Sequence, residues 1–168
     1  YDGRVHAYWL DKTEHGSWPF AVTQPGEGFY RFASEPVVAD LDNDGKAEVI
    51  FASWTQNNSS RPGKLYVVSW DGKLIQSLDL PWNPADKRGG SLAAPTLANI
   101  DADPDLELVV GTINQGLVAY DIGNTANARV LWGTGRGSYQ RTGLAPAAAP
   151  AQGSLKHSSK QVNDLTPA

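Results

Sequence analysis

The stretch PVVADLDNDGKAEVI, residues 36–50, decides the fold because it occurs twice in the chain. The second copy, PTLANIDADPDLELV, spans residues 95–109 and aligns with the first without a gap. A second element recurs as well, since GRVHAYWLD at 3–11 matches GKLYVVSWD at 63–71 and GLVAYD at 116–121. Repetition of this kind indicates a chain built from similar structural units.

Each unit is predicted to consist of four short strands. In the middle unit they cover residues 36–41, 47–53, 64–70 and 73–80. In the third unit they cover residues 95–100, 106–112, 116–122 and 129–133, and the first unit is only a second half. Leu74, Gln76, Leu78 and Leu80 follow on one face with period two, which is typical of a strand. Asp71-Gly72 predicts a two-residue type I′ turn. We therefore predict an all-β fold of β-propeller blades, about two and a half four-stranded antiparallel units.

The chain divides into two regions by composition. Residues 1–143 carry the repeats, whereas residues 144–168 are rich in Ala and Pro and then polar, which predicts an extended tail. An incomplete ring of blades leaves open sheet edges. We therefore expect the missing blades to come from upstream sequence, from another chain or from symmetry copies. We also expect the tail to lie against a partner subunit of a larger assembly.

Composition excludes several function classes. The absence of Cys removes disulfides, thiol catalysis and zinc sites built on thiolates. The net charge of -4 argues against nucleic acid as a partner, and no apolar run is long enough to span a membrane. His6 and His15 have no Ser–Asp arrangement visible in the sequence, so we expect solvated or packing roles for them and no enzymatic activity.

The first copy of the repeat contains a candidate metal loop. Carboxylates occupy positions 1, 3, 5 and 9 of this loop, which are Asp40, Asp42, Asp44 and Glu48. Gly45 permits the sharp turn and the carbonyl of Lys46 adds a ligand. All of these ligands are oxygen atoms, which favours Ca²⁺ over transition metals. An Asp-rich turn without a metal is the alternative.

The second copy is a weaker version of the same loop. Asn99 replaces the first aspartate and Pro104 replaces the glycine, and proline cannot adopt a positive φ. The remaining candidate ligands are Asp101, Asp103, the carbonyl of Asp105, and Glu107. We expect this loop to bind Ca²⁺ less tightly than the first.

These two segments resemble the FG-GAP/VCBS repeats of integrin-α-like β-propellers, in which a strand, an Asp-rich loop and a second strand recur in each blade. GRVHAYWLD and GKLYVVSWDGK are similar to the third and fourth strands of bacterial members, and Trp18-Pro19-Phe20 is similar to an element that ends a blade. The resemblance covers about residues 1–143. It implies an extracytoplasmic location (periplasmic, cell-surface or secreted), Ca²⁺ that stiffens the blades, and a role in adhesion, scaffolding or ligand binding.

Three function classes follow from these features. The metal loops and the tail favour a non-enzymatic module for protein interaction or scaffolding. Trp54 and Trp82 lie at the mouths of loops, where an aromatic ring could stack on a sugar or anchor a protein, so a glycan-binding lectin is the alternative. A polysaccharide-active enzyme needs convergent ionisable residues beyond the Asp-rich loops, which the sequence does not display.

Overall fold

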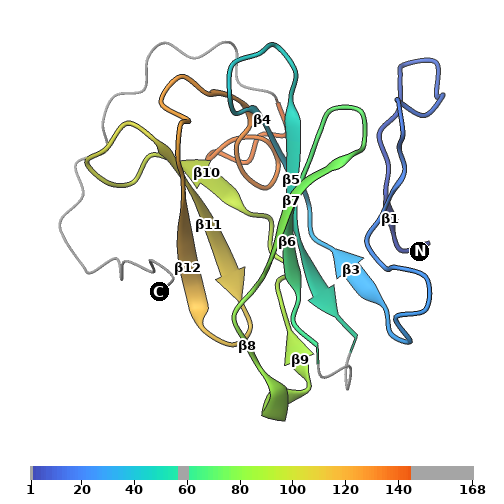
Figure 1. Cartoon of the computed structure of the whole chain (residues 1–168). Helices are drawn as coiled ribbons and strands as arrows, with labels where there is room; N and C mark the ends of the chain where they lie inside the picture. The colour runs from blue at the N-terminus through green and yellow to red at the C-terminus, as the bar shows by residue number, and fades with distance from the viewer. Residues whose placement is uncertain (1, 57–60, 145–168) are drawn as a thin grey trace.

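The structure is a computed structural model that describes residues 2–56 and 61–144 (Figure 1). Beyond Leu144, the predicted tail lies outside the described residues. The strands are β1 (Arg4–Val5), β2 (Phe20–Ala21), β3 (Arg31–Ala33), β4 (Val37–Asp40), β5 (Glu48–Thr55), β6 (Lys64–Val68), β7 (Leu74–Asp79), β8 (Trp82–Asn83), β9 (Arg88–Gly89), β10 (Thr96–Ala98), β11 (Leu106–Thr112), β12 (Gly116–Ile122) and β13 (Arg129–Trp132), with one 3-10 turn, η1 (Pro84–Asp86). The described residues contain no α-helix, which confirms the all-β class, and none of their helical turns could cross a membrane.

The middle repeat unit forms the predicted four-stranded antiparallel sheet. Strands β4, β5, β6 and β7 pair in sequence order, with Val38 opposite Val49 and Tyr66 opposite Ser77. The predicted strand ranges agree with the observed ones to within a few residues at each end. Strand β3, which the sequence did not predict, pairs with the far end of β5.

The predicted position of the last strand is wrong. Residues 129–133 were expected to complete the third unit, but β13 pairs with β4 of the middle unit, and the third sheet contains only β10, β11 and β12. The physical reason is that the edge of β4 has free backbone groups, which β13 satisfies. The carbonyl of Gly133 then accepts a hydrogen bond from the N–H of Leu97 on β10, at 2.8 Å, so this segment joins the two sheets.

The predicted turn between β6 and β7 is also wrong in type. A type I′ turn needs two central residues with positive φ, but among Trp70, Asp71 and Gly72 only Gly72 has one, at 89°. The N–H of Gly72 donates to the carbonyl of Ser69 at 2.9 Å, and the N–H of Ser69 donates to the carbonyl of Lys73 at 2.8 Å. The connection is therefore a three-residue loop that ends in a left-handed glycine, and the pairing register shifts beside it.

The middle sheet is buried on both faces. One core lies between it and the third sheet and includes Ile50 together with Leu108 and Val110. The other core lies between the middle sheet and the β1–β2 hairpin and includes Phe51 together with Trp18. Because successive residues of a strand point to opposite faces, neighbouring positions of β5 serve different cores. The three β-layers therefore stack side by side across the view of Figure 1.

Equivalent residues of the two repeats face in the same direction along the stack. Val49 and Phe51 of the middle unit point toward the preceding hairpin. Their equivalents in the third unit, Leu108 and Val110, point toward the middle sheet, which precedes it. The repeat in sequence is therefore also a repeat in packing.

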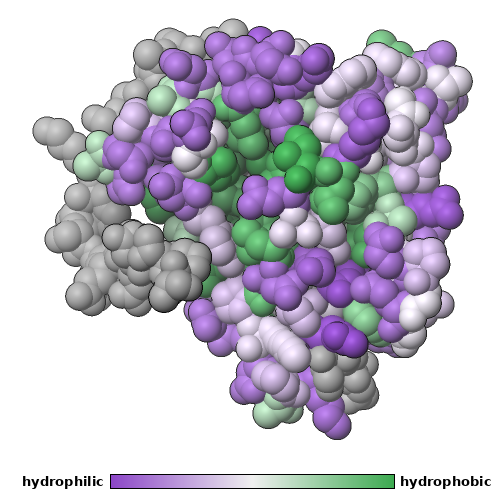
Figure 2. Space-filling model, in the orientation of Figure 1, coloured by the Kyte–Doolittle hydropathy of each residue, from purple (hydrophilic) through white to green (hydrophobic). Residues whose placement is uncertain are grey.

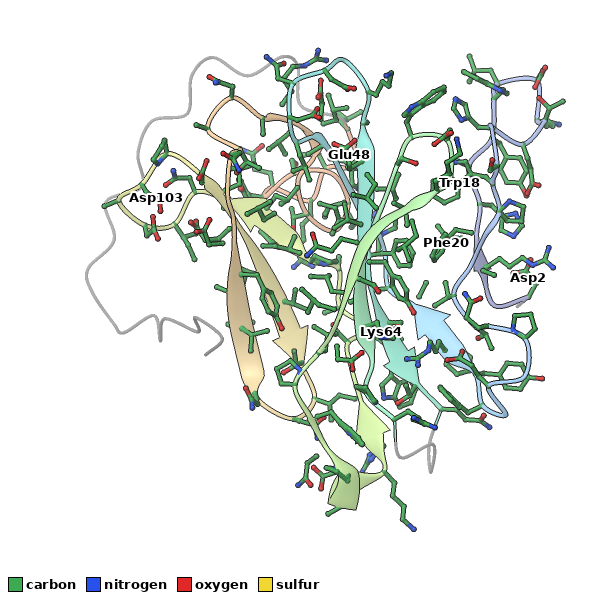
Figure 3. The ribbon with its side chains drawn as sticks, viewed as in Figure 1. Asp2, Trp18, Phe20, Glu48, Lys64 and Asp103 are labelled. Carbon is green, nitrogen blue, oxygen red and sulfur yellow. The ribbon has the colours of Figure 1, made fainter. Side chains whose placement is uncertain are left out.

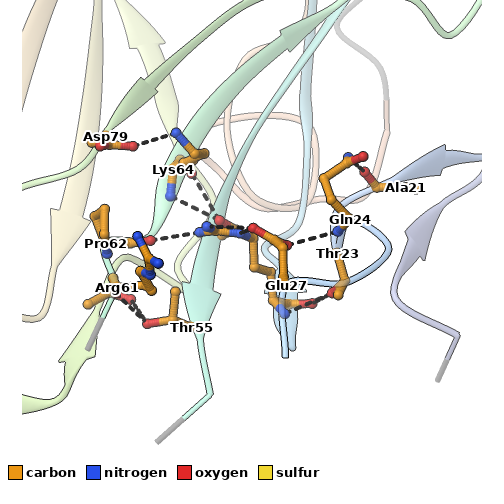
Figure 4. Close-up of polar contacts among 12 residues, drawn as sticks. Ala21, Thr23, Gln24, Glu27, Thr55, Arg61, Pro62, Lys64 and Asp79 are labelled. Atoms are coloured by element: carbon orange, nitrogen blue, oxygen red, sulfur yellow. Dashed lines mark hydrogen bonds and ion pairs between the residues drawn. The ribbon is translucent and has the colours of Figure 1, made fainter. Parts of the chain in front are cut away.

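A buried arginine fixes the connection between the hairpin and the middle sheet. The Arg31 side chain donates to the carbonyl of Pro62 at 2.7 Å and forms an ion pair with Glu27 at 3.1 Å (Figure 4). Arg31 is 4% exposed, so the paired carboxylate and carbonyl compensate the cost of burying its charge. This contact holds the 23–31 loop against the segment that enters β6.

The outer strand of the middle sheet is open to solvent. Figure 2 shows apolar surface near the centre of this face of the molecule, in the region of strand β7. Leu74 and Ile75 of β7 are 51% and 56% exposed, whereas Leu80, just after the strand, is buried. Strand β7 is therefore an exposed edge.

Candidate metal centre

The first Asp-rich loop connects β4 to β5 at the upper end of the molecule in Figure 1. Asp40, Asp42 and Asp44 each bring one carboxylate oxygen to within 4.8 Å of the others. Asn43 and Gly45 have positive φ values of 59° and 90°, which lets this short loop reverse its direction. The three side chains therefore converge as the spacing predicted.

Hydrogen bonds within this loop fix the carboxylates in place. Asp42 accepts from the N–H of Asp44 at 3.1 Å, and Asp44 accepts from the N–H of Lys46 at 2.7 Å. Glu48 at the start of β5 accepts from the N–H of Leu41 at 2.9 Å. These bonds close the loop from both ends, and Figure 3 shows Glu48 at the base of the loop, where β5 begins.

The second loop, between β10 and β11, repeats this pattern. Asp101 accepts from the N–H of Asp103 and Asp103 accepts from the N–H of Asp105, both at 2.9 Å. Glu107 accepts from the N–H of Ile100 at 2.6 Å. Each bond has its counterpart at the aligned positions of the first loop, so the two loops share one hydrogen-bond pattern, although Ala102 and Pro104 lack the positive φ of Asn43 and Gly45.

The two loops differ in how their first and sixth positions are joined. In the first loop the N–H of Gly45 donates to Asp40 at 3.0 Å. Pro104 has no N–H to donate, and the Asn99 amide donates instead to the carbonyl of Asp103 at 2.5 Å. The replacement of aspartate by asparagine therefore supplies the donor that the proline removes.

Each loop contains a buried carboxylate oxygen without a hydrogen-bond partner. These atoms are Oδ1 of Asp40 and Oε1 of Glu107, in residues that are 1% and 4% exposed. A buried acceptor left unsatisfied costs about 1–3 kcal/mol, and more when it is charged. A cation held among the carboxylates of each loop would satisfy the unpartnered oxygen of that loop, so the residues present fit a bound metal ion in each.

Burial and charge also act on the glutamates. Burial raises the pKa of the Glu48 carboxyl, the N–H of Leu41 opposes this, and the charges of Asp42, Asp44 and Asp40 raise it further. Burial likewise raises the pKa of Glu107, against the N–H of Ile100 and with the charges of Asp101 and Asp103. Without a cation, the loops therefore disfavour a full set of ionised carboxylates.

The structure separates the predicted ligands into two groups. The first cluster contains Asp40, Asp42 and Asp44, and the second contains Asp101, Asp103 and Glu107. Glu48 lies outside the first cluster. The ammonium of Lys46 pairs with Asp44 at 3.4 Å and is largely exposed.

The Asp105 carboxylate turns away from the second cluster. It accepts from the N–H groups of Asn124 and Thr125 at 3.1 and 2.8 Å. Only its backbone carbonyl is left as a ligand, which is the group that the sequence proposed.

The tryptophans proposed as contact residues are half-buried. Trp54 lies on β5, 6.1 Å from the Phe32 ring between ring centres, and Trp82 lies on β8. The indole N–H of each is buried and unpartnered. Among the tryptophans, Trp9 and Trp70 are more exposed, at 55% and 43%, and Tyr8 is 58% exposed.

Sequence reasoning missed a charged cluster on the first hairpin. The imidazole of His6 contacts Glu14 through Nδ1 at 2.6 Å and Asp2 through Nε2 at 2.8 Å. The Tyr8 hydroxyl lies 3.0 Å from Nδ1 of His6. The alternation of Asp2, His6 and Tyr8 places them on one face of a strand and was the available signal, but the pairing of Glu14 with Tyr8 across the hairpin was not visible.

Comparisons with known proteins found no matching family profile, no matching curated protein and no matching solved structure. The fold and the loops are therefore interpreted from this chain alone.

Proposed function

We propose that this chain is a non-enzymatic, calcium-stabilised segment of an FG-GAP/VCBS-like β-propeller that acts as an interaction module outside the cytoplasm. The observation that carries this proposal is the pair of buried, unpartnered carboxylate oxygens on Asp40 and Glu107. Each belongs to a cluster of three carboxylates. Ligand sets made only of oxygen atoms favour Ca²⁺, and extracellular sites of this kind bind it at roughly 10⁻⁴–10⁻³ M.

The stacking of the sheets supports the propeller part of the proposal. Val37, Ala39 and Ile50 of the middle sheet are buried against the third sheet. Their equivalents on the third sheet are Thr96, Ala98 and Val109, which form its outer face and are only partly buried. These three side chains are small to medium in size and mostly apolar, as are the buried side chains at the equivalent positions of the middle sheet. The outer face therefore suits another repeat unit, supplied by the same polypeptide or by a partner subunit.

The calcium assignment is tested by thermal unfolding of the whole chain with and without calcium. At about 10 mM Ca²⁺, a site with a Kd of 10⁻⁴–10⁻³ M stabilises the fold by about 1.4–2.7 kcal/mol. Asp42→Asn removes a ligand charge but keeps an oxygen that can accept from the N–H of Asp44. It should therefore lower the Tm in Ca²⁺ and leave the Tm in EDTA unchanged or slightly higher, because one of the repelling charges is removed.

The matched control is Asp11→Asn. Asp11 also accepts a hydrogen bond from the backbone two residues ahead, but it lies in the first hairpin, away from both loops. Its effect on Tm should be the same in both buffers. No calcium-dependent Tm shift in the wild-type chain, or an equal loss in both buffers for Asp42→Asn, contradicts the metal assignment.

Glycan binding is the second candidate function, and exposed aromatic rings of the first hairpin and of the β6–β7 turn favour it. The His15 ring lies 4.0 Å from Trp9 and 5.1 Å from Trp70, measured between ring centres. Trp9 and Trp70 are held by this contact and still present open surface, as sugar-stacking residues do. A glycan array gives the test: binding that Trp9→Ala abolishes supports this function, and an array without signal removes it.

A further inference from the structure

The segment that carries the chain from the third sheet to the middle sheet contacts both Asp-rich loops. It comprises residues 122–132 and ends in strand β13. Its beginning is bound to the second loop and its end is bound next to the first loop.

The second loop holds the beginning of the segment. The Asp105 carboxylate accepts from the N–H groups of Asn124 and Thr125. In return the Thr125 hydroxyl accepts from the N–H of Leu106 at 2.7 Å. Thr125 is 4% exposed, so this exchange is shielded from water. The turn at 124–125 therefore depends on the position of Asp105.

The first loop holds the end of the segment. Strand β13 pairs with β4 at three positions, Arg129 with Asp40, Val130 with Ala39, and Trp132 with Val38. Asp40 is both the last residue of β4 and the first residue of the metal loop. Its carboxylate lies 3.7 Å from the guanidinium of Arg129 and is the group with the unpartnered Oδ1 atom.

The residues after β13 join both units. The Thr134 hydroxyl lies 2.8 Å from that of Thr96, and the Tyr139 hydroxyl donates to the carbonyl of Leu97 at 2.7 Å. The N–H of Arg136 donates to Glu35 of the middle unit at 2.7 Å. If β13 leaves β4, these contacts lose the strand that positions them.

We propose that cation binding at the two Asp-rich loops controls the docking of strand β13 on β4, and that Arg129 is a tethered, partial substitute for the cation. This inference rests on the proposed calcium binding. Without a cation, the crowded carboxylates repel one another and loosen the residues that anchor the segment. A bound cation removes that repulsion at Asp40 and beside Asp105, and thereby stabilises the short ladder between β13 and β4. The Arg129 guanidinium offsets part of the same negative charge when the cation is absent.

Hydrogen exchange of the whole chain in Ca²⁺ and in EGTA tests this coupling. The amides of residues 129–133 should exchange about 10- to 100-fold more slowly at about 10 mM Ca²⁺, because the factor 1 + [Ca²⁺]/Kd sets the shift in the opening equilibrium. The amides of β6, two strands away from β4 in the same sheet, report the opening of the whole fold, so in EGTA the amides of 129–133 should exchange faster than these if β13 opens on its own. They serve as the internal reference.

Two variants isolate the contribution of Arg129. Arg129→Gln should accelerate exchange at 129–133 in EGTA and have little effect in Ca²⁺. Arg88→Gln removes the same charge from exposed strand β9, which lies at the opposite end of the molecule from the first loop (Figure 1), and should change neither. Identical behaviour of the two variants overturns the role assigned to Arg129.

Calorimetry on the same sample separates the two levels of the proposal. Heat of calcium binding without any slowing of exchange at 129–133 overturns the coupling and leaves the calcium site standing. Absence of binding heat and of any Tm shift overturns the calcium site itself. Binding together with slowed exchange at 129–133 supports both.

Discussion

The burial of the middle sheet on both faces leads to a prediction about neighbouring residues of β5. Ile50 and Phe51 are both fully buried, although they point in opposite directions. Ile50→Ala should cost about 2–5 kcal/mol and Phe51→Ala about 3–5 kcal/mol of unfolding free energy. The Phe51 ring also packs against Tyr66 at 5.2 Å and Phe20 at 5.8 Å between ring centres, so its cost should lie in the upper part of that range.

Urea unfolding measures both costs, and Ile75→Ala on β7 is the matched control. Ile75 is 56% exposed on the open edge of the same sheet, so its truncation should cost less than about 1 kcal/mol. A sheet covered on one face only would tolerate one of the two β5 substitutions as well as it tolerates Ile75→Ala. If either Ile50→Ala or Phe51→Ala costs less than about 1 kcal/mol, the stacking of three β-layers is refuted.

Three further predictions concern the loops, the hairpin and a close backbone contact. Calorimetry should show tighter Ca²⁺ binding at the first loop than at the second. Asp42→Asn should remove the tighter site and Asp101→Asn the weaker one. Equal affinities of the two loops would contradict the penalty assigned to Pro104. The hydrogen bonds to Glu14 and Asp2 raise the pKa of His6 above 6.5. The stabilisation of the fold by these bonds is therefore complete below pH 6.5 and is lost as the pH rises through the pKa of the folded state. An NMR titration that finds a pKa of His6 below 6.5 would contradict this. Gly90→Ala should cost more than about 2 kcal/mol of unfolding free energy, because Gly90 has a φ of 109° and a β-carbon there would overlap the Ser53 carbonyl. Gly26 also has a positive φ but has open space around it, so Gly26→Ala should cost only about 1 kcal/mol. Similar losses for the two variants in urea unfolding would contradict the overlap.

The repeat made much of the fold predictable. The aligned copies at 36–50 and 95–109 predicted two strand–loop–strand elements, and the structure has β4–β5 and β10–β11 at those positions. It also places six of the predicted carboxylates, all but Glu48, in two clusters with matching hydrogen bonds. Local spacing was sufficient here because each loop is closed by residues within nine positions of one another.

The errors arose where the structure depends on contacts distant in the sequence. Residues 129–133 do form a strand, but the choice between the edges of β12 and β4 depends on the turn at Thr125, which Asp105 fixes from a distance. The Asp71-Gly72 pair predicted the hairpin correctly and its type incorrectly, because Trp70 joins the turn. Of the partners of His6, Glu14 was not predictable, since it reaches the imidazole across the hairpin.

The exchanged donor and acceptor in the two loops make their first and sixth positions interdependent. Asp40 with Gly45 and Asn99 with Pro104 are two solutions to the same closure. Aspartate with proline leaves it unmade because neither residue supplies a donor, whereas asparagine with glycine keeps both an acceptor oxygen and the backbone donor. In loops of this kind, the residue at the first position therefore determines whether proline is compatible with the sixth position. A sequence pattern that scores the two positions separately treats the second loop as a degenerate copy, whereas one that scores them jointly recognises Asn99 with Pro104 as a second way to close the loop.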